Sequence, residues 1–288
     1  MELWFLGTGA GDFRACEDPA NEEEYVVRAR ELGGRNLRDA SQALIAPEVL
    51  IDFHSDRQLV QQQVDTRRIK HLLITHCHWD HFRPAQILAF ADSLPEALHV
   101  YGNETAEAGL EFASTYVWEA EEKRFAVRPG EANIVFHAIR PEQTLVVGSL
   151  QVTAVLANHH VNPETRVMEE RALNYVVEEN GRTLFYGLDS STVLPGTMDS
   201  LASRRFDSIV LDATFGFLEI DRAKSGHHNF EMIQETVASL RSRGILTEEA
   251  VVYGSHVSLE RVPPHDDVVD EAAQMGITLA YDGLRVTV

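Results

Sequence analysis

Histidine and aspartate are clustered in this 288-residue chain in a pattern that suits metal binding. The densest cluster consists of His76, His78, Asp80 and His81, and it directly follows the apolar segment 71–74, which predicts a short strand. In extended backbone, residues two apart point to the same side, so His76 and His78 can bind one ion together. Asp80 and His81 follow after a turn and can serve a second ion close by. The spacing therefore predicts a metal site at the end of a strand.

Further candidate ligands follow other predicted strands. These strands are 151–156, 183–186 and 251–253, and the candidates behind them are His159 or its neighbour His160, Asp189, and His256. A carboxylate such as Asp189 suits a position between two cations, because each of its oxygens can bind one ion while its charge reduces their repulsion. The sequence thus offers ligands for two ions from several separate strands.

Composition and charge restrict the class of protein. The chain has 45 acidic and 25 basic residues, and its net charge of −20 disfavours binding to extended nucleic acid. No apolar stretch of about 18 residues occurs, so we expect neither a membrane span nor a signal peptide. Cys16 and Cys77 are the only cysteines, which excludes a disulfide framework. We expect a soluble protein of the cytoplasm.

The order of the predicted elements defines the fold class. Strands occur in two groups, each followed by helices, and this order predicts two sheets between two layers of helices. We therefore expect an α+β protein with an αββα four-layer sandwich, formed by a single domain over residues 1–288. The segment 12–40 is highly charged and lacks a regular pattern apart from a helix near 22–32, so we expect it to be a surface excursion.

These motifs resemble those of the metallo-β-lactamase-fold hydrolases, which carry a His-x-His-x-Asp-His motif, a later histidine, an aspartate and a final histidine in this order. The run Ser225-Gly226-His227-His228-Asn229, which opens a predicted helix, resembles the phosphodiesterase branch of that superfamily. This branch includes ribonuclease Z and the phosphoribosyl cyclic phosphate phosphodiesterases. The resemblance implies that one ion is held by three histidines, that the other is held by an aspartate and two histidines, and that an aspartate bridges them. The first set is His76, His78 and His159, the second is Asp80, His81 and His256, and the bridging residue is Asp189.

The function that the resemblance implies is hydrolysis of a small or cyclic phosphodiester by a metal-bound hydroxide. Two divalent ions would serve as cofactors, and zinc or manganese suits the ligands, with iron also compatible. Asp80 would orient the hydroxide as well as bind metal. His227, or else its neighbour His228, would contact the phosphate or protonate the leaving group. Arg166, Arg171 and Lys224 are candidates for contacts with the substrate phosphate because positive charge is scarce near the ligand segments, although a solvated position explains each of them better.

Other functions remain open at this stage. The same hydroxide could hydrolyse a lactone, a thioester or an amide, and the fold also suits a metal or ligand sensor or a di-iron redox protein.

The closest phosphodiesterases carry a Cys-x-Cys-x-x-Cys cluster that binds structural zinc, whereas this chain has only Cys16 in that region, so we expect no structural zinc. The basic arm of ribonuclease Z also has no counterpart. We expect a small phosphodiester as substrate and a homodimer as the assembly.

Overall fold

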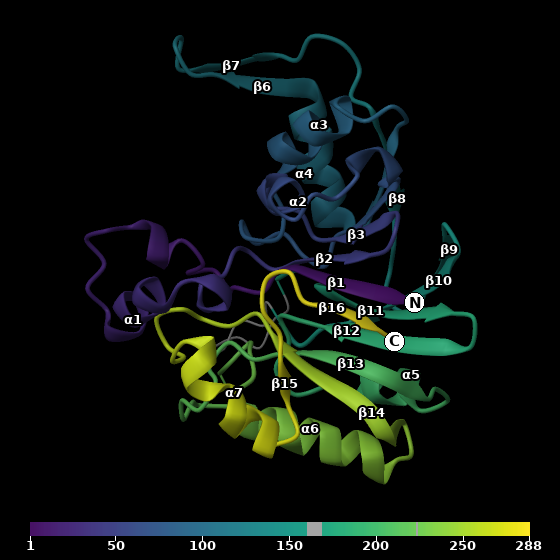
Figure 1. Cartoon of the computed structure of the whole chain (residues 1–288). Coiled ribbons are helices and arrows are strands. Elements are labelled where there is room, and N and C mark those ends of the chain that lie inside the picture. Colours follow the sequence, from purple (N-terminus) through teal and green to yellow (C-terminus); the bar gives the residue numbers. More distant parts are fainter. Residues whose placement is uncertain (160–168, 223) are drawn as a thin grey trace.

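The computed structural model describes residues 1–159, 169–222 and 224–288. Two seven-stranded sheets pack face to face, and helices cover the outer face of each sheet, which gives an αββα sandwich (Figure 1). The candidate residues His160 and Arg166 lie outside the described residues. The first and last strands of the chain pair with each other, so the two termini lie close together in the first sheet (Figure 1).

The first sheet has the strand order β16-β1-β2-β3-β4-β5-β8. Its strands are β1 (Glu2–Gly7), β2 (Gln42–Ile45), β3 (Val49–Ile51), β4 (His71–Leu73), β5 (Leu98–Gly102), β8 (Ile134–Ala138) and β16 (Arg285–Thr287). The neighbours β3, β4, β5 and β8 are parallel, so their carboxyl ends lie at one edge of the sheet. The short strand β4 is almost entirely buried, and it leads the chain to the first histidine cluster.

The second sheet has the order β15-β14-β13-β12-β11-β10-β9. Its strands are β9 (Thr144–Val147), β10 (Leu150–Leu156), β11 (Leu173–Glu179), β12 (Arg182–Gly187), β13 (Phe206–Asp212), β14 (Leu246–Ser255) and β15 (Thr278–Leu279). The strands β12, β13 and β14 are parallel, and β10 runs in the same direction because β11 is antiparallel to both β10 and β12. Since β15 is also parallel to β14, five strands of this sheet end at the same edge.

Three apolar layers hold the sandwich together. Between the sheets lie side chains such as Phe5, Tyr175 and Tyr186, all of them buried. Outside the first sheet pack α2 (Arg57–Gln61), α3 (Pro84–Asp92) and α4 (Glu104–Thr115), and outside the second sheet pack α5 (Pro195–Leu201), α6 (Phe230–Ser242) and α7 (His265–Gln274). The buried faces of these helices remove apolar surface from water, which is the main force that keeps the layers in register.

The segment 12–40 forms a layer of its own beside the second sheet. It contains α1 (Glu24–Leu32) and the short 3-10 helices Ala15–Glu17 and Gly34–Asn36. Arg28 and Asn36 hydrogen bond to Asp267 and Asp266, so the segment is attached to the start of α7 (Figure 1). The helix expected near 22–32 is confirmed.

The strands and helices that the sequence predicts are present, most with ends shifted by one or two residues and β14 extended by five at its start. Two further features were not expected. One is α5, and the other is a separate two-stranded hairpin formed by β6 (Tyr116–Glu119) and β7 (Arg124–Val127). No helix among the described residues is both long enough and apolar enough to cross a membrane.

Candidate metal centre

The candidate ligands converge at the edge where the carboxyl ends of the strands from both sheets meet. His76 follows β4 of the first sheet, whereas His159, Asp189 and His256 follow β10, β12 and β14 of the second. Because these strands are held in register by two different sheets, the sandwich brings together side chains that are far apart in the sequence. All of the candidate ligands except His78 are buried. The full set is His76, His78, Asp80, His81, His159, Asp189 and His256.

One group of donor atoms comes from His76, His78, His159 and Asp189, whose ligand atoms all lie within 4.8 Å of one another. Nδ1 of His78 lies 3.2 Å from Nε2 of His159. Nε2 of His76 and Nε2 of His159 lie 3.9 and 3.8 Å from Oδ1 of Asp189. This group contains the three histidines expected for the first ion.

A second group consists of Asp80, His81 and His256, again within 4.8 Å of one another. The Nε2 atoms of His81 and His256 lie 3.2 Å apart, and Oδ2 of Asp80 lies 3.3 and 3.5 Å from them. Asp189 faces this group as well, because its Oδ2 lies 3.1 Å from Nε2 of His81. Oδ1 of Asp189, which faces the first group, also lies 3.4 Å from Nε2 of His256, so Asp189 lies between the two groups and contacts both.

These separations fit metal coordination. A ligating imidazole nitrogen lies roughly 2.0–2.1 Å from zinc, so two such nitrogens on one ion lie roughly 2.9–3.4 Å apart. The closest pairs in both groups fall in this range. The donor set of imidazoles and carboxylates is also the one that zinc, manganese and iron accept.

The histidines are oriented by hydrogen bonds at their other ring nitrogens. Nδ1 of His81 lies 2.8 Å from the buried Asp52 carboxylate, and Nδ1 of His159 lies 3.1 Å from the carbonyl oxygen of Gly226. Since a carboxylate or a carbonyl only accepts, Nδ1 carries a proton and Nε2 is the nitrogen that faces the cluster. Gly226 is needed for this approach, because a Cβ atom there would lie 2.9 Å from Nδ1 of His159. Sequence reasoning missed Asp52, which precedes His81 by 29 residues.

Three residues of this region have left-handed backbone conformations, which side chains other than glycine adopt at a cost of order 1–3 kcal/mol. They are Asp52, Asp189 and His256, with φ angles of 60°, 47° and 59°. Asp189 and His256 occupy the turns that leave β12 and β14, so the strained backbone aims each side chain back into the cluster. Such strain is typical of functional sites.

Electrostatics show why the cluster favours a cation. Burial lowers the pKa of His81, but the carboxylates of Asp189, Asp80 and Asp52 outweigh burial and hold it well above its ordinary value. Burial in turn raises the pKa of Asp189, and the neighbouring His256, His81 and His76 outweigh it and hold that pKa well below its ordinary value. Buried carboxylates at this density require positive charge, which protons or metal ions can supply.

His227 lies beside the cluster and is oriented by an aspartate. Oδ2 of Asp212, the last residue of β13, lies 2.6 Å from Nδ1 of His227, whose ring stacks on His256 at 5.4 Å. Burial lowers the pKa of His227, but Asp212 outweighs it and the net pKa is about 9. Oδ1 of Asp212 accepts hydrogen bonds from the backbone of Thr214 and His228, so the aspartate both shapes its own loop and contacts the site.

The remaining candidates lie elsewhere. His228 is buried against Thr236 of α6, with 3.2 Å between Nε2 and Oγ1, so of the two neighbouring histidines His227 is the one at the cluster. Asn229 caps α6 by accepting a hydrogen bond from Met232. Arg171 and Lys224 form ion pairs with Glu104 and Asp221.

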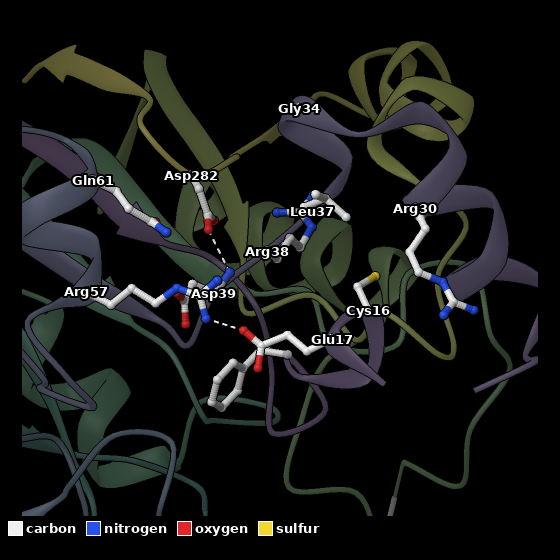
Figure 2. Close-up of a pocket in the computed structure, with 11 residues that line it drawn as sticks. Cys16, Glu17, Arg30, Gly34, Leu37, Arg38, Asp39, Arg57, Gln61 and Asp282 are labelled. Atoms are coloured by element: carbon white, nitrogen blue, oxygen red, sulfur yellow. Dashed lines mark hydrogen bonds and ion pairs between the residues drawn. The ribbon is translucent and has the colours of Figure 1, made fainter. Parts of the chain in front are cut away.

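The 12–40 segment borders a separate cavity of about 340 Å³. Figure 2 shows Arg57 directed toward Glu17 and Asp282 directed toward the backbone of Asp39, across the cavity from Cys16 and Arg30. None of the eleven residues that line it belongs to the histidine cluster. The cavity is therefore distinct from the candidate metal centre.

Comparison with known proteins identifies the family. The sequence profile of the beta-lactamase superfamily domain matches residues 38–254. The chain belongs to the beta-lactamase superfamily. The superfamily match spans every donor residue except His256, which lies two residues beyond its end. No curated protein sequence matches the chain significantly.

Solved structures of similar fold support the architecture of this beta-lactamase superfamily member. They include Zn²⁺-bound PqqB from Methylobacterium extorquens, with 17% identity, 100% of each chain covered and a TM-score of 0.68. Human tRNase Z, short form, has 20% identity, coverage of 100% of this chain and 99% of its own, and a TM-score of 0.65. A diphosphatase from the PhnP family has 18% identity, coverage of 100% and 97%, and a TM-score of 0.66. The chain thus has the metallo-β-lactamase fold of metal-dependent hydrolases, with His and Asp clusters able to bind metal.

Proposed function

We propose that this protein is a phosphodiesterase that hydrolyses a small or cyclic phosphodiester at a centre of two divalent metal ions. The observation that carries the proposal is the position of His227, held by Asp212 and stacked on His256 beside two groups of metal-binding side chains. A protonated imidazole there suits the negatively charged oxygens of a phosphodiester. Two of the solved structures of similar fold are described as a tRNase Z and a diphosphatase, which supports the same reaction class.

The metal ions would be held as the donor groups suggest. His76, His78 and His159 would hold one ion, Asp80, His81 and His256 would hold the other, and Asp189, which contacts both groups, would be shared between them. Zinc or manganese suits this set, and iron is compatible. When bound, two such ions supply a nucleophile from water at neutral pH and neutralise charge on the phosphoryl group.

The protein's own residues would orient the attacking water and protonate the leaving group. Asp80, with only 6% of its side chain exposed, would accept a hydrogen bond from the attacking water and orient it. The Nδ1 atom of His227 is engaged by Asp212, so Nε2 is the nitrogen that donates to a phosphate oxygen or to the leaving group. Asp212 keeps the imidazole in the orientation that permits this donation.

Charge argues for a small substrate. A net charge of −20 repels long polyanions, and Arg171 and Lys224, two of the cations considered for phosphate contacts, are paired with carboxylates. Cys16 and Cys77 are free, which fits a reducing compartment, and we propose the cytoplasm as the location.

A panel of substrates tests the proposal. Bis(p-nitrophenyl) phosphate, a 2′,3′-cyclic nucleotide and an acyl lactone would be assayed side by side with Mn²⁺ or Zn²⁺ added. We expect turnover of at least one phosphodiester and loss of that turnover in the chelator-treated protein. Activity on the lactone alone would overturn the proposal in favour of a carbonyl hydrolase, and metal binding without hydrolysis of any substrate would favour a sensor.

A further inference from the structure

An exposed apolar surface lies on the β6–β7 hairpin, which projects beyond α3 and α4 at the far end of the first sheet (Figure 1). The two strands pair only with each other, in the register Tyr116 to Val127 and Trp118 to Phe125. Side chains alternate between the faces of a strand, so these four residues share one face. An isolated two-stranded hairpin is only marginally stable in water.

Phe112 of α4 extends this face. Its ring lies 5.3 Å from the rings of both Tyr116 and Phe125, and the rings of Trp118 and Phe125 are 5.1 Å apart. We call the five side chains Phe112, Tyr116, Trp118, Phe125 and Val127 the hairpin face. Each is between 42% and 74% exposed. Single exposed apolar residues are common, whereas a contiguous group of this size marks an interaction surface.

We propose that the hairpin face is the contact through which two copies of this chain form a symmetric dimer. In a twofold assembly the same patch meets itself, so an apolar face can be covered without a second kind of surface. This inference is independent of the proposed catalytic function.

The local charge supports a second copy as the occupant. Residues 116–128 contain Glu119, Glu121 and Glu122 together with Lys123, Arg124 and Arg128, so the hairpin is neutral within a chain of net charge −20. Two copies that meet at this hairpin therefore bring no net charge of the hairpin into the contact. The absence of excess positive charge in this hairpin also disfavours anionic lipid and nucleic acid.

The area is sufficient for a modest interface. An aromatic side chain buries roughly 150–250 Å² when fully covered, so the half-exposed hairpin face leaves roughly 500 Å² to cover in each copy. Two copies together reach the value of about 1,000 Å² that a specific interface requires. We therefore expect a reversible dimer whose population depends on protein concentration.

Sedimentation velocity and light scattering over a range of micromolar concentrations test the proposal. For the wild-type protein we expect the mass to rise from 32.3 kDa toward twice that value as concentration increases. Trp118→Ser and, separately, Val127→Glu should each weaken the dimer at least tenfold. The matched control is Val60→Glu, because Val60 is 69% exposed on α2, away from the hairpin face. Thermal unfolding would verify that every variant is folded.

Four results would overturn the proposal. The first is a wild-type monomer at all concentrations, and the second is a dimer that both hairpin variants leave unchanged. The third is a monomer that binds neutral phosphatidylcholine vesicles through the hairpin face, which would assign the surface to lipid instead. A dimer that Val60→Glu disrupts as strongly as Val127→Glu would also contradict it.

Discussion

The Asp212 carboxylate lies 2.6 Å from Nδ1 of His227, and the imidazole that it orients stacks on His256 at the edge of the metal-binding cluster. Asp212 is fully buried, whereas 23% of the His227 side chain is exposed. The pair thus joins a fixed internal carboxylate to an imidazole that a substrate can reach. In the proposed mechanism, His227 donates to the substrate and the neighbouring histidines and aspartates bind metal.

Replacing His227 should therefore lower the rate without removing metal. We expect His227→Ala to reduce kcat roughly 10²–10⁴-fold, because it removes the proton donor. The loss should be smaller for p-nitrophenyl esters, whose leaving group needs no proton. Asp212→Asn should give a smaller reduction of the same kind. Since Asp212 and His227 also form a group with Asp189 and His256 that could hold metal, metal content must be measured in parallel. Loss of metal from His227→Ala would make His227 a ligand.

Asp189→Ala should differ from His227→Ala, because it should remove metal as well as activity. The substitution removes the carboxylate that faces both donor groups, and it leaves the buried imidazoles with less negative charge to balance a cation. We expect metal content and activity to fall together. Elemental analysis after dialysis against metal-free buffer measures this, and full metal retention in Asp189→Ala would show that the aspartate is not shared between two ions.

Asp52 should affect metal affinity although it is not one of the candidate ligands. Its carboxylate accepts from Nδ1 of His81 and from the backbone and hydroxyl of Thr75. Loss of such a supporting hydrogen bond typically costs 10–100-fold in metal affinity, so we expect Asp52→Asn to weaken binding by roughly that factor. Competition titration with a chromophoric chelator measures the change. Asp270→Asn, at an exposed position of α7, is the control and should leave affinity unchanged.

Site residues that are neighbours in the chain were easier to predict from the sequence than site residues that only the fold brings together. His76, His78, Asp80 and His81 form a dense local motif, and the candidates behind later strands follow the same rule of strand ends. Asp52 gave no such signal, because it is a single aspartate after a short strand and its partner comes 29 residues later. From the sequence, Asp212 at the end of the apolar segment 209–211 could either line the site or cap the following loop, and in the structure it makes both kinds of contact.

The β6–β7 hairpin was missed for a related reason. Its strands do not pack in either sheet, so the apolar pattern that marks buried strands does not apply to them. The helix α5 was missed because it is short, and its sequence contains Pro195 and Gly196, which are poor helix formers. The single-domain organisation of residues 1–288 stays a prediction.

Asp282, which borders the cavity in Figure 2, should make stability depend on pH. Burial raises the pKa of Asp282 to about 7, although hydrogen bonds from Thr8 and Asp39 oppose the increase. The folded protein therefore holds this proton more tightly than the unfolded chain does. The stabilisation from this group is complete below the ordinary aspartate pKa of 3.8 and is lost as pH rises through about 7.

Asp282→Asn cannot ionise and should remove this dependence. The substitution also removes a hydrogen bond, which changes Tm by an amount that does not vary with pH. The informative quantity is therefore how the difference in Tm between variant and wild type changes with pH. We expect that difference to move in favour of the variant between about pH 4 and about pH 7 and to level off above that range. Asp270→Asn should show no such trend, and a constant difference for Asp282→Asn over this range would refute the explanation.

The central claim is that this chain binds two metal ions in the cluster around Asp189. The most direct measurement is the metal content per chain, by inductively coupled plasma mass spectrometry, of protein purified without chelator and then saturated with Zn²⁺ or Mn²⁺ and dialysed. The account predicts close to two transition-metal ions per chain in the wild-type protein. A protein that retains none, although it is folded, would contradict it.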